Sequence, residues 1–118
     1  MPLPALTHET LWAILRDELD DDTANQLVWS ALGYRWTGEQ WSAESVDSSW
    51  REAYPEPPNF IESRPATVKL TRSIAPQHKQ LLKEVLGFGG YKIDELVPRK
   101  TRRATMVNWL LGYMQNGG

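Results

Sequence analysis

The chain of 118 residues has no cysteine and only two histidines. The absence of cysteine excludes disulfide bonds, thiol catalysis and cysteine-ligated zinc sites. His8 and His78 have no patterned partner, so a metal site would have to be built from carboxylates. The run Asp20–Asp22 lacks the pattern and the glycine of a calcium loop, and it is interpreted as a helix cap and a solvated turn. We therefore expect no metal and no cofactor.

Long apolar runs are also absent. The longest apolar stretch lies near Val107–Met114 and is too short to cross a bilayer. Residues Met1–Leu6 carry neither the basic region nor the apolar region of a secretory signal. We expect a protein without membrane insertion, in the cytoplasm or, in a plastid-bearing host, in the stroma. The length and the 41% apolar content predict one compact domain over residues 1–118.

Charge is distributed unevenly along the chain, although the net charge is only −2. Residues 1–59 contain 11 acids and 3 bases, whereas residues 60–118 contain 4 acids and 10 bases. One interpretation is that the basic half binds an acidic protein or a nucleic acid. The other is that the two halves fold against each other and neutralise internally.

Local patterns in the first half predict helices and one hairpin. Thr7 is a candidate N-cap for a helix whose apolar residues continue to Leu19, and a second helix follows the acidic run, capped by one of its aspartates, and ends at Gly33. A turn after Tyr34–Trp36 would place Trp36 opposite Trp41. Ser45–Tyr54 is expected to be a short helix.

In the second half, the alternation of Ala66–Arg72 predicts a strand. Pro76 predicts the start of a helix that ends at Gly87. Tyr91–Val97 is expected to add a short helix closed by a proline, and Thr101–Met114 forms the last helix. The fold class is therefore α+β, mostly helical, with a small antiparallel sheet or hairpin.

The last helix has two apolar faces on a helical wheel. Its core face centres on Val107 and includes Arg103. A second stripe lies roughly opposite and consists of Arg102, Met106, Trp109 and Tyr113. These residue types are enriched at the centres of protein interfaces, so the stripe predicts a partner-binding surface. The alternative is a central helix that its own domain covers on both sides.

Cations crowd the start of this helix, where the macrodipole favours anions. Such a start needs either a separate cap or an anionic partner, and Arg99, Lys100 and Arg103 are assigned to electrostatic steering of that partner. Alternatively, Arg99 and Lys100 lie outside the helix and turn toward the acidic half. Arg64 and Arg72 could join an anion-binding patch with Lys69, but on the predicted strand Lys69 and Arg72 point to opposite faces.

Several strings in this chain are similar to a small family of cyanobacterial and plastid proteins, a domain of unknown function. The resemblance covers nearly the whole chain, and its most specific strings are Leu27–Trp29, Leu32–Arg35, Trp50–Pro58, Ser63–Arg72, Lys79–Glu84, Gly90–Ile93 and Thr101–Ala104. It implies a photosynthetic host and a cytoplasmic or stromal setting, and it supplies no site residues.

These observations favour a non-enzymatic adaptor or regulatory module that binds a protein with an acidic surface. The second hypothesis is a nucleic-acid-binding domain that uses the basic half. Two observations count against it: the polar side of the last helix beyond its first turns carries no Lys or Arg, and nucleic-acid-binding domains are usually basic, whereas the net charge here is −2. An enzyme that acts on an anionic small molecule is the third.

Overall fold

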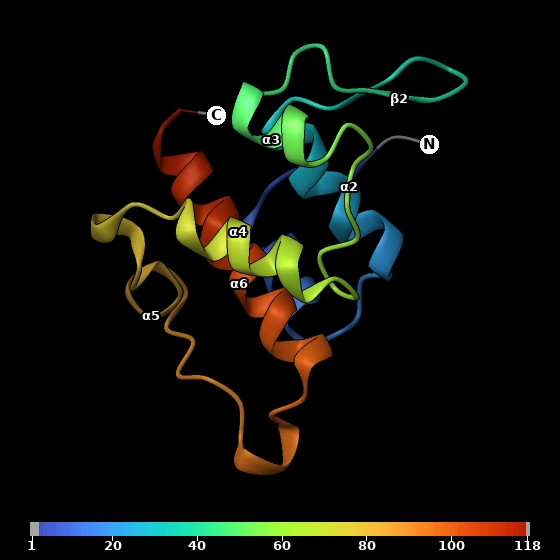
Figure 1. The fold of residues 1–118 in the computed structure, drawn as a ribbon. Helices are drawn as coiled ribbons and strands as arrows, with labels where there is room; N and C mark the ends of the chain where they lie inside the picture. Colours follow the sequence, from blue (N-terminus) through green and yellow to red (C-terminus); the bar gives the residue numbers. More distant parts are fainter. Residues whose placement is uncertain (1–2, 118) are drawn as a thin grey trace.

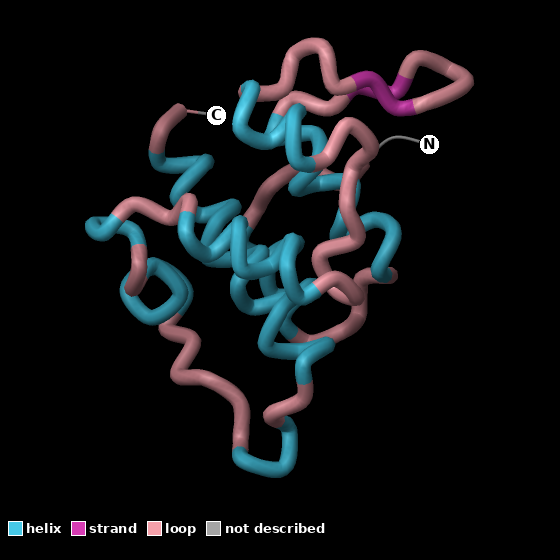
Figure 2. The backbone as a smooth tube through the Cα atoms, viewed as in Figure 1, coloured by secondary structure: helices cyan, strands magenta, loops and turns pink. Residues whose placement is uncertain are grey.

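The computed structural model describes residues 3–117; residues 1, 2 and 118 of the predicted domain lie outside the described residues. The described chain is mostly helical with one short antiparallel hairpin, which confirms the α+β class (Figures 1 and 2). In chain order its elements are α1 (His8–Leu15), α2 (Asp21–Leu32), β1 (Arg35–Trp36), β2 (Trp41–Ser42), α3 (Ser48–Ala53), α4 (Arg64–Arg72), the 3-10 turn η1 (Pro76–His78), α5 (Leu81–Leu86), the 3-10 turn η2 (Ile93–Glu95) and α6 (Pro98–Gln115).

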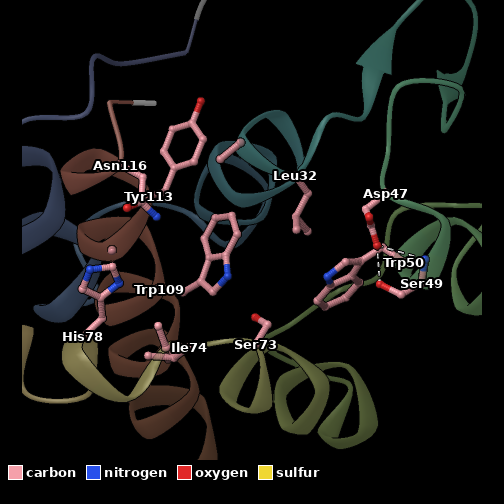
Figure 3. Close-up of a pocket in the computed structure, with 13 residues that line it drawn as sticks. Leu32, Asp47, Ser49, Trp50, Ser73, Ile74, His78, Trp109, Tyr113 and Asn116 are labelled. Carbon is pink, nitrogen blue, oxygen red and sulfur yellow. Dashed lines mark hydrogen bonds between the residues drawn. The ribbon is translucent and has the colours of Figure 1, made fainter.

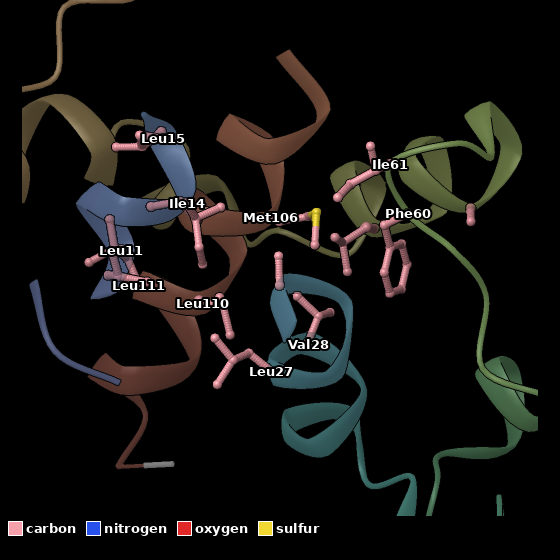
Figure 4. Close-up of a cluster of buried hydrophobic side chains, with 14 of the residues drawn as sticks. Leu11, Ile14, Leu15, Leu27, Val28, Phe60, Ile61, Met106, Leu110 and Leu111 are labelled. Carbon is pink, nitrogen blue, oxygen red and sulfur yellow. The ribbon is translucent and has the colours of Figure 1, made fainter. Parts of the chain in front are cut away.

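Helix α6 lies at the centre of the molecule and packs against α1, α2, α4, α5 and η1 (Figure 1). Its fully buried Val107 and Leu110 belong to the same apolar cluster as Ile14 of α1 and Val28 of α2. Figure 4 shows Leu110 beside Ile14 and Val28 in this cluster. Phe60 and Ile61, which precede α4, close the other side of this core. The Cα radius of gyration is 13.7 Å, close to the roughly 13.5 Å expected for one domain of this length. Within residues 3–117, no helix combines the length and apolarity needed to span a bilayer.

Helix ends in the first half are fixed by the residues that the sequence indicates. The Thr7 hydroxyl accepts the Thr10 N–H, and the Asp20 carboxylate accepts the Thr23 N–H. Gly33 ends α2 with φ of 113°, and a Cβ there would lie 2.6 Å from the backbone oxygen of Ser45. Helix α1 ends at Leu15, earlier than its apolar pattern suggests, because the chain turns at Asp17 with φ of 59°.

The predicted hairpin is confirmed, with Trp36 paired to Trp41 in antiparallel register. Their ring centroids are 5.7 Å apart, and Trp41 also meets Trp29 edge-on at 5.2 Å. Trp29 donates its indole N–H to the Pro58 oxygen at 2.6 Å, which ties α2 to the proline-rich segment before α4.

The predicted strand over Ala66–Arg72 is wrong, because this segment is helix α4. The Ser63 hydroxyl caps its start by accepting the Ala66 N–H, and a proline occupies its first turn. Ala66, Thr67 and Leu70 are the buried residues, a helical and not an alternating set. A segment of seven residues is too short to distinguish the helical period of about 3.6 residues from the strand period of two.

Helix α6 begins at Pro98 and not at Thr101. Proline is favoured in the first turn of a helix, where its missing N–H costs nothing. Arg99 and Lys100 therefore belong to the helix, so the expectation that they lie outside it is wrong. Val97 stands at the N-cap and its side chain makes no capping hydrogen bond.

Candidate functional site

The cations at the start of α6 are neutralised inside the molecule. Arg103 is completely buried, and its guanidinium donates to the backbone oxygens of Ile14 and Leu19. It also lies 3.2 Å from an Asp21 oxygen and 3.4 Å from an Asp17 oxygen. Burial lowers the pKa of Arg103, and the two aspartates oppose that effect. Arg103 therefore joins α6 to the α1–α2 connection instead of facing a partner.

Arg99 binds the same two aspartates. Its Nη2 lies 2.6 Å from an oxygen of Asp17 and 2.6 Å from one of Asp21. Hydrogen bonding to Arg99 is the main cause that lowers the pKa of Asp17, and those bonds raise the pKa of Arg99. Both carboxylates also lie at the positive end of α6, so acids from another element offset the cost of its cationic start.

Two further cations near this helix start have internal contacts. Lys100 pairs with Glu95 of η2 at 3.4 Å. Arg102 donates to the backbone oxygen of Ile61 at 2.9 Å and is partly buried. The geometry thus supports internal neutralisation for Arg99, Lys100 and Arg103, and it gives Arg102 a bond that holds the entry of α4.

The predicted contact stripe on α6 divides into a buried part and an open part. Met106 is completely buried, so its expected place on an exposed stripe is wrong. The physical reason is that α4 covers this side of α6, since Met106 contributes to the same core as Phe60 and Ile61 (Figure 4). Trp109 and Tyr113 remain partly exposed, with their rings stacked at 5.9 Å and 12° between planes.

Trp109 and Tyr113 line a hollow of about 440 Å³ between α3, α6 and the end of α4 (Figure 3). We call it the aromatic lobe; its described lining residues are Ala31, Leu32, Asp47, Ser49, Trp50, Ser73, Ile74, Ala75, His78, Trp109, Gly112, Tyr113 and Asn116. The indole nitrogens of Trp50 and Trp109 face each other across this hollow in Figure 3. Neither indole N–H has a protein acceptor among residues 3–117, and both are open to solvent, since no buried side-chain donor of the described residues lacks a partner.

The wall of the aromatic lobe at η1 depends on a glycine. A Cβ on Gly112 of α6 would lie 3.0 Å from Nδ1 of His78, so the absence of a side chain lets the imidazole sit against the helix. Asn108 fixes the same turn, because its amide donates to the His78 oxygen at 3.0 Å while its own oxygen accepts the Leu82 N–H. Asn108 and Gly112 thus serve packing.

A second hollow, of about 580 Å³, adjoins the first along α4. We call it the cationic lobe; its described lining residues are Ser49, Trp50, Arg64, Pro65, Val68, Lys69, Arg72 and Ser73. Because α4 is a helix, Lys69 and Arg72 lie about 60° apart around its axis and line the same hollow as Arg64, so the expectation that Lys69 and Arg72 point apart is wrong. The Lys69 ammonium lies 5.0 Å from the centre of the Trp50 ring.

The two lobes differ in charge and share Trp50. No acid is among the described residues that line the cationic lobe, and Arg64 and Arg72 form no ion pair within residues 3–117. In the aromatic lobe Asp47 accepts the N–H and the hydroxyl of Ser49, bonds that lower the pKa of its carboxyl. Together the lobes form one open surface, the α3–α4–α6 groove.

Sequence reasoning missed Trp50 and His78 as members of this groove. Trp50 is 5% exposed and looks like ordinary core in the sequence pattern, and His78 has no patterned partner there. One signal could have found the cationic lobe. The Ser63 cap and Pro65 indicate a helix, and a helical wheel of that segment places Lys69 and Arg72 about 60° apart, with all three cations on the half opposite its buried residues.

The chain belongs to the family described as "Domain of unknown function (DUF1823)", which matches residues 5–115. It is similar to a protein whose solution NMR structure is known, with 60% sequence identity and a TM-score of 0.81 over 99% of this chain and 98% of the other. No curated protein matches the chain. The comparisons therefore establish the family and the fold.

Proposed function

We propose that this protein is a non-enzymatic adaptor or regulatory module that binds an acidic protein at the α3–α4–α6 groove. One observation carries the proposal: partly exposed Trp109 and Tyr113 border the same groove as three α4 cations, of which Arg64 and Arg72 have no acidic partner among the described residues. Exposed aromatic rings beside arginines are typical of interface centres.

The location of the proposed surface differs from the one that the sequence suggests. Arg99, Lys100 and Arg103 pair with Asp17, Asp21 and Glu95, so their charge is already compensated. The steering of an acidic partner passes to Arg64 and Arg72. Trp109 and Tyr113 keep their assigned role as contact residues, and Trp50 joins them.

Catalysis has less support in the groove. Asp47 is the acid that lines it among residues 3–117, and hydrogen bonds from Ser49 lower the pKa of its carboxyl. A general acid needs a raised pKa, so this carboxylate is poorly suited to donate a proton. Binding without a reaction is the simpler use of these residues. The proposal further places the protein in the cytoplasm or plastid stroma of a photosynthetic cell.

The proposal is tested by affinity capture from a lysate of the host, with wild type beside Trp109→Ala and beside Arg64→Gln/Arg72→Gln. We expect a defined protein that both variants lose, and that binds wild type again after purification with an affinity about 30-fold above that of Trp109→Ala. Identical captured sets for all three proteins would contradict the proposal. Loss of capture after nuclease treatment would favour a nucleic acid.

A further inference from the structure

Trp50 presents an unused hydrogen-bond donor in the aromatic lobe. Only 5% of the residue is exposed, and its indole N–H, which has no acceptor within residues 3–117, is open to solvent where it points into the hollow (Figure 3). Trp109 presents a second such donor from the opposite wall. By contrast, Trp29 donates to the Pro58 oxygen at 2.6 Å. The two free N–H groups are open to solvent on facing walls, so a ligand that brings acceptors can bond to both.

The electrostatics of the aromatic lobe favour a neutral acceptor over an anion. Its one charged lining residue within the described chain is Asp47, which stays anionic because its pKa is lowered. Leu32 and Asn116, at the carboxyl ends of α2 and α6, also line this hollow, and the carboxyl end of a helix disfavours an anion. A peptide carbonyl meets these conditions, and the apolar walls at Leu32, Ile74 and Tyr113 leave room for an aliphatic side chain.

The cationic lobe favours several separated negative charges. Arg64 and Arg72 are eight residues apart on α4, which corresponds to about 12 Å along a helix axis. One phosphate cannot reach both ends of that row. An extended chain advances about 3.4 Å per residue, so about four residues span the same distance. Acidic side chains spread over such a segment match the row of cations.

We infer that the groove binds an extended peptide segment of the partner, with one apolar side chain in the aromatic lobe and acidic residues over α4. The indole N–H groups of Trp50 and Trp109 donate to the main-chain carbonyls of that segment, while Arg64, Lys69 and Arg72 face its carboxylates. This inference rests on the proposed function and specifies the ligand of the same groove.

The test titrates the full ¹⁵N-labelled protein with the peptide Ac-Glu-Glu-Gly-Leu-Gly-Glu-Glu-NH2, whose acids flank the leucine on both sides. The readout is the set of tryptophan indole N–H resonances. We expect the signals of Trp50 and Trp109 to move while that of Trp29, which is already bonded, stays in place. Replacing every Glu by Gln should weaken binding at least about fivefold, and replacing Leu by Gly should remove the Trp109 shift.

Two tryptophan variants separate ring contact from hydrogen bonding. Trp109→Phe keeps an aromatic ring and removes the N–H, and it should weaken the peptide about two- to tenfold. Trp36→Phe on the hairpin is the matched control and should leave the affinity unchanged. Equal affinity of the Glu and Gln peptides, or shifts confined to Trp36, would overturn the inference. So would a stronger response of the same two signals to a ten-nucleotide oligothymidine, which would identify a single-stranded nucleic acid as the ligand.

The peptide titration and the affinity capture distinguish a wrong ligand from a wrong binding surface. If the peptide does not bind but a captured protein still requires Trp109 and Arg72, the groove binds a folded surface and only the inference falls. If neither the peptide nor any protein depends on these residues, both fall.

Discussion

The cations of α6 and the cations of α4 have opposite surroundings. Arg99 and Arg103 contact Asp17 and Asp21, which lie more than 75 residues away in the sequence. Arg64 and Arg72 line an open lobe with no acid among its described lining residues. The denser cluster of cations in the sequence, at the start of α6, is thus the one that acids of the same chain neutralise. A run of like charge indicates function only when its neighbours in space leave it uncompensated.

The largest expected effect concerns the buried Arg103 and the two aspartates that neutralise it. In Asp17→Asn/Asp21→Asn, the fully buried Arg103 loses both carboxylates, so the free energy of unfolding should fall by about 3 kcal/mol. Denaturant unfolding at neutral pH measures this. Arg64→Gln/Arg72→Gln is the control and should change stability by less than about 0.5 kcal/mol. Similar losses in both variants would contradict the distinction.

Met106 and Trp109 allow the same comparison within the predicted stripe. Met106 is completely buried, so Met106→Ala should lower the free energy of unfolding by about 2 to 3 kcal/mol. Trp109→Phe, at the open hollow, should change stability by less than about 1 kcal/mol. Thermal unfolding of the two variants beside wild type measures both values. A larger loss for Trp109→Phe would place that ring in the core.

Acid should weaken the α6 cluster in a defined pH range. The pKa of Asp17 is lowered in the folded protein by Arg99, so its stabilising contribution is complete above the unfolded value of 3.8. It is lost as the pH falls through the lower folded pKa. We expect the stability of Asp17→Asn to decline less than that of wild type below about pH 4, as followed by unfolding at several pH values. Parallel curves would show that Asp17 is not coupled to Arg99.

The smallest expected effect concerns Lys100. Its ion pair with Glu95 is long, at 3.4 Å, and both side chains are substantially exposed. Lys100→Gln should therefore lower the free energy of unfolding by no more than about 0.5 kcal/mol. A loss above about 1 kcal/mol in denaturant unfolding would show that this pair, like that of Arg103, is structural.

The sequence predicted those features that depend on neighbouring residues. The Thr7 cap, the end of α2 at Gly33 and the Trp36–Trp41 pair follow from local chemistry, and the structure confirms them. The α4 segment was predicted as a strand because apolar residues at every second position also fit a short helix. The cap at Ser63 decides between the two.

Long-range charge pairing was beyond sequence reasoning. The uneven charge of the two halves allowed internal neutralisation as one interpretation. However, no sequence pattern indicates that Asp17 adopts a left-handed backbone conformation, or that its carboxylate binds Arg99, which lies 82 residues further along the chain. The groove was missed for the same reason, since Trp50 and Trp109 come together only through the packing of α3 and α4 beside α6. Tertiary contacts determined which cations remained available.

The most direct test compares two variants of equal charge. Arg64→Gln/Arg72→Gln and Arg99→Gln/Lys100→Gln each remove two positive charges, and isothermal titration calorimetry measures their affinity for the acidic heptapeptide at low salt. We predict a loss of about tenfold or more for the α4 variant and less than about twofold for the α6 variant. Equal losses, or a greater loss for the α6 variant, would contradict the claim that the α4 cations form the binding surface.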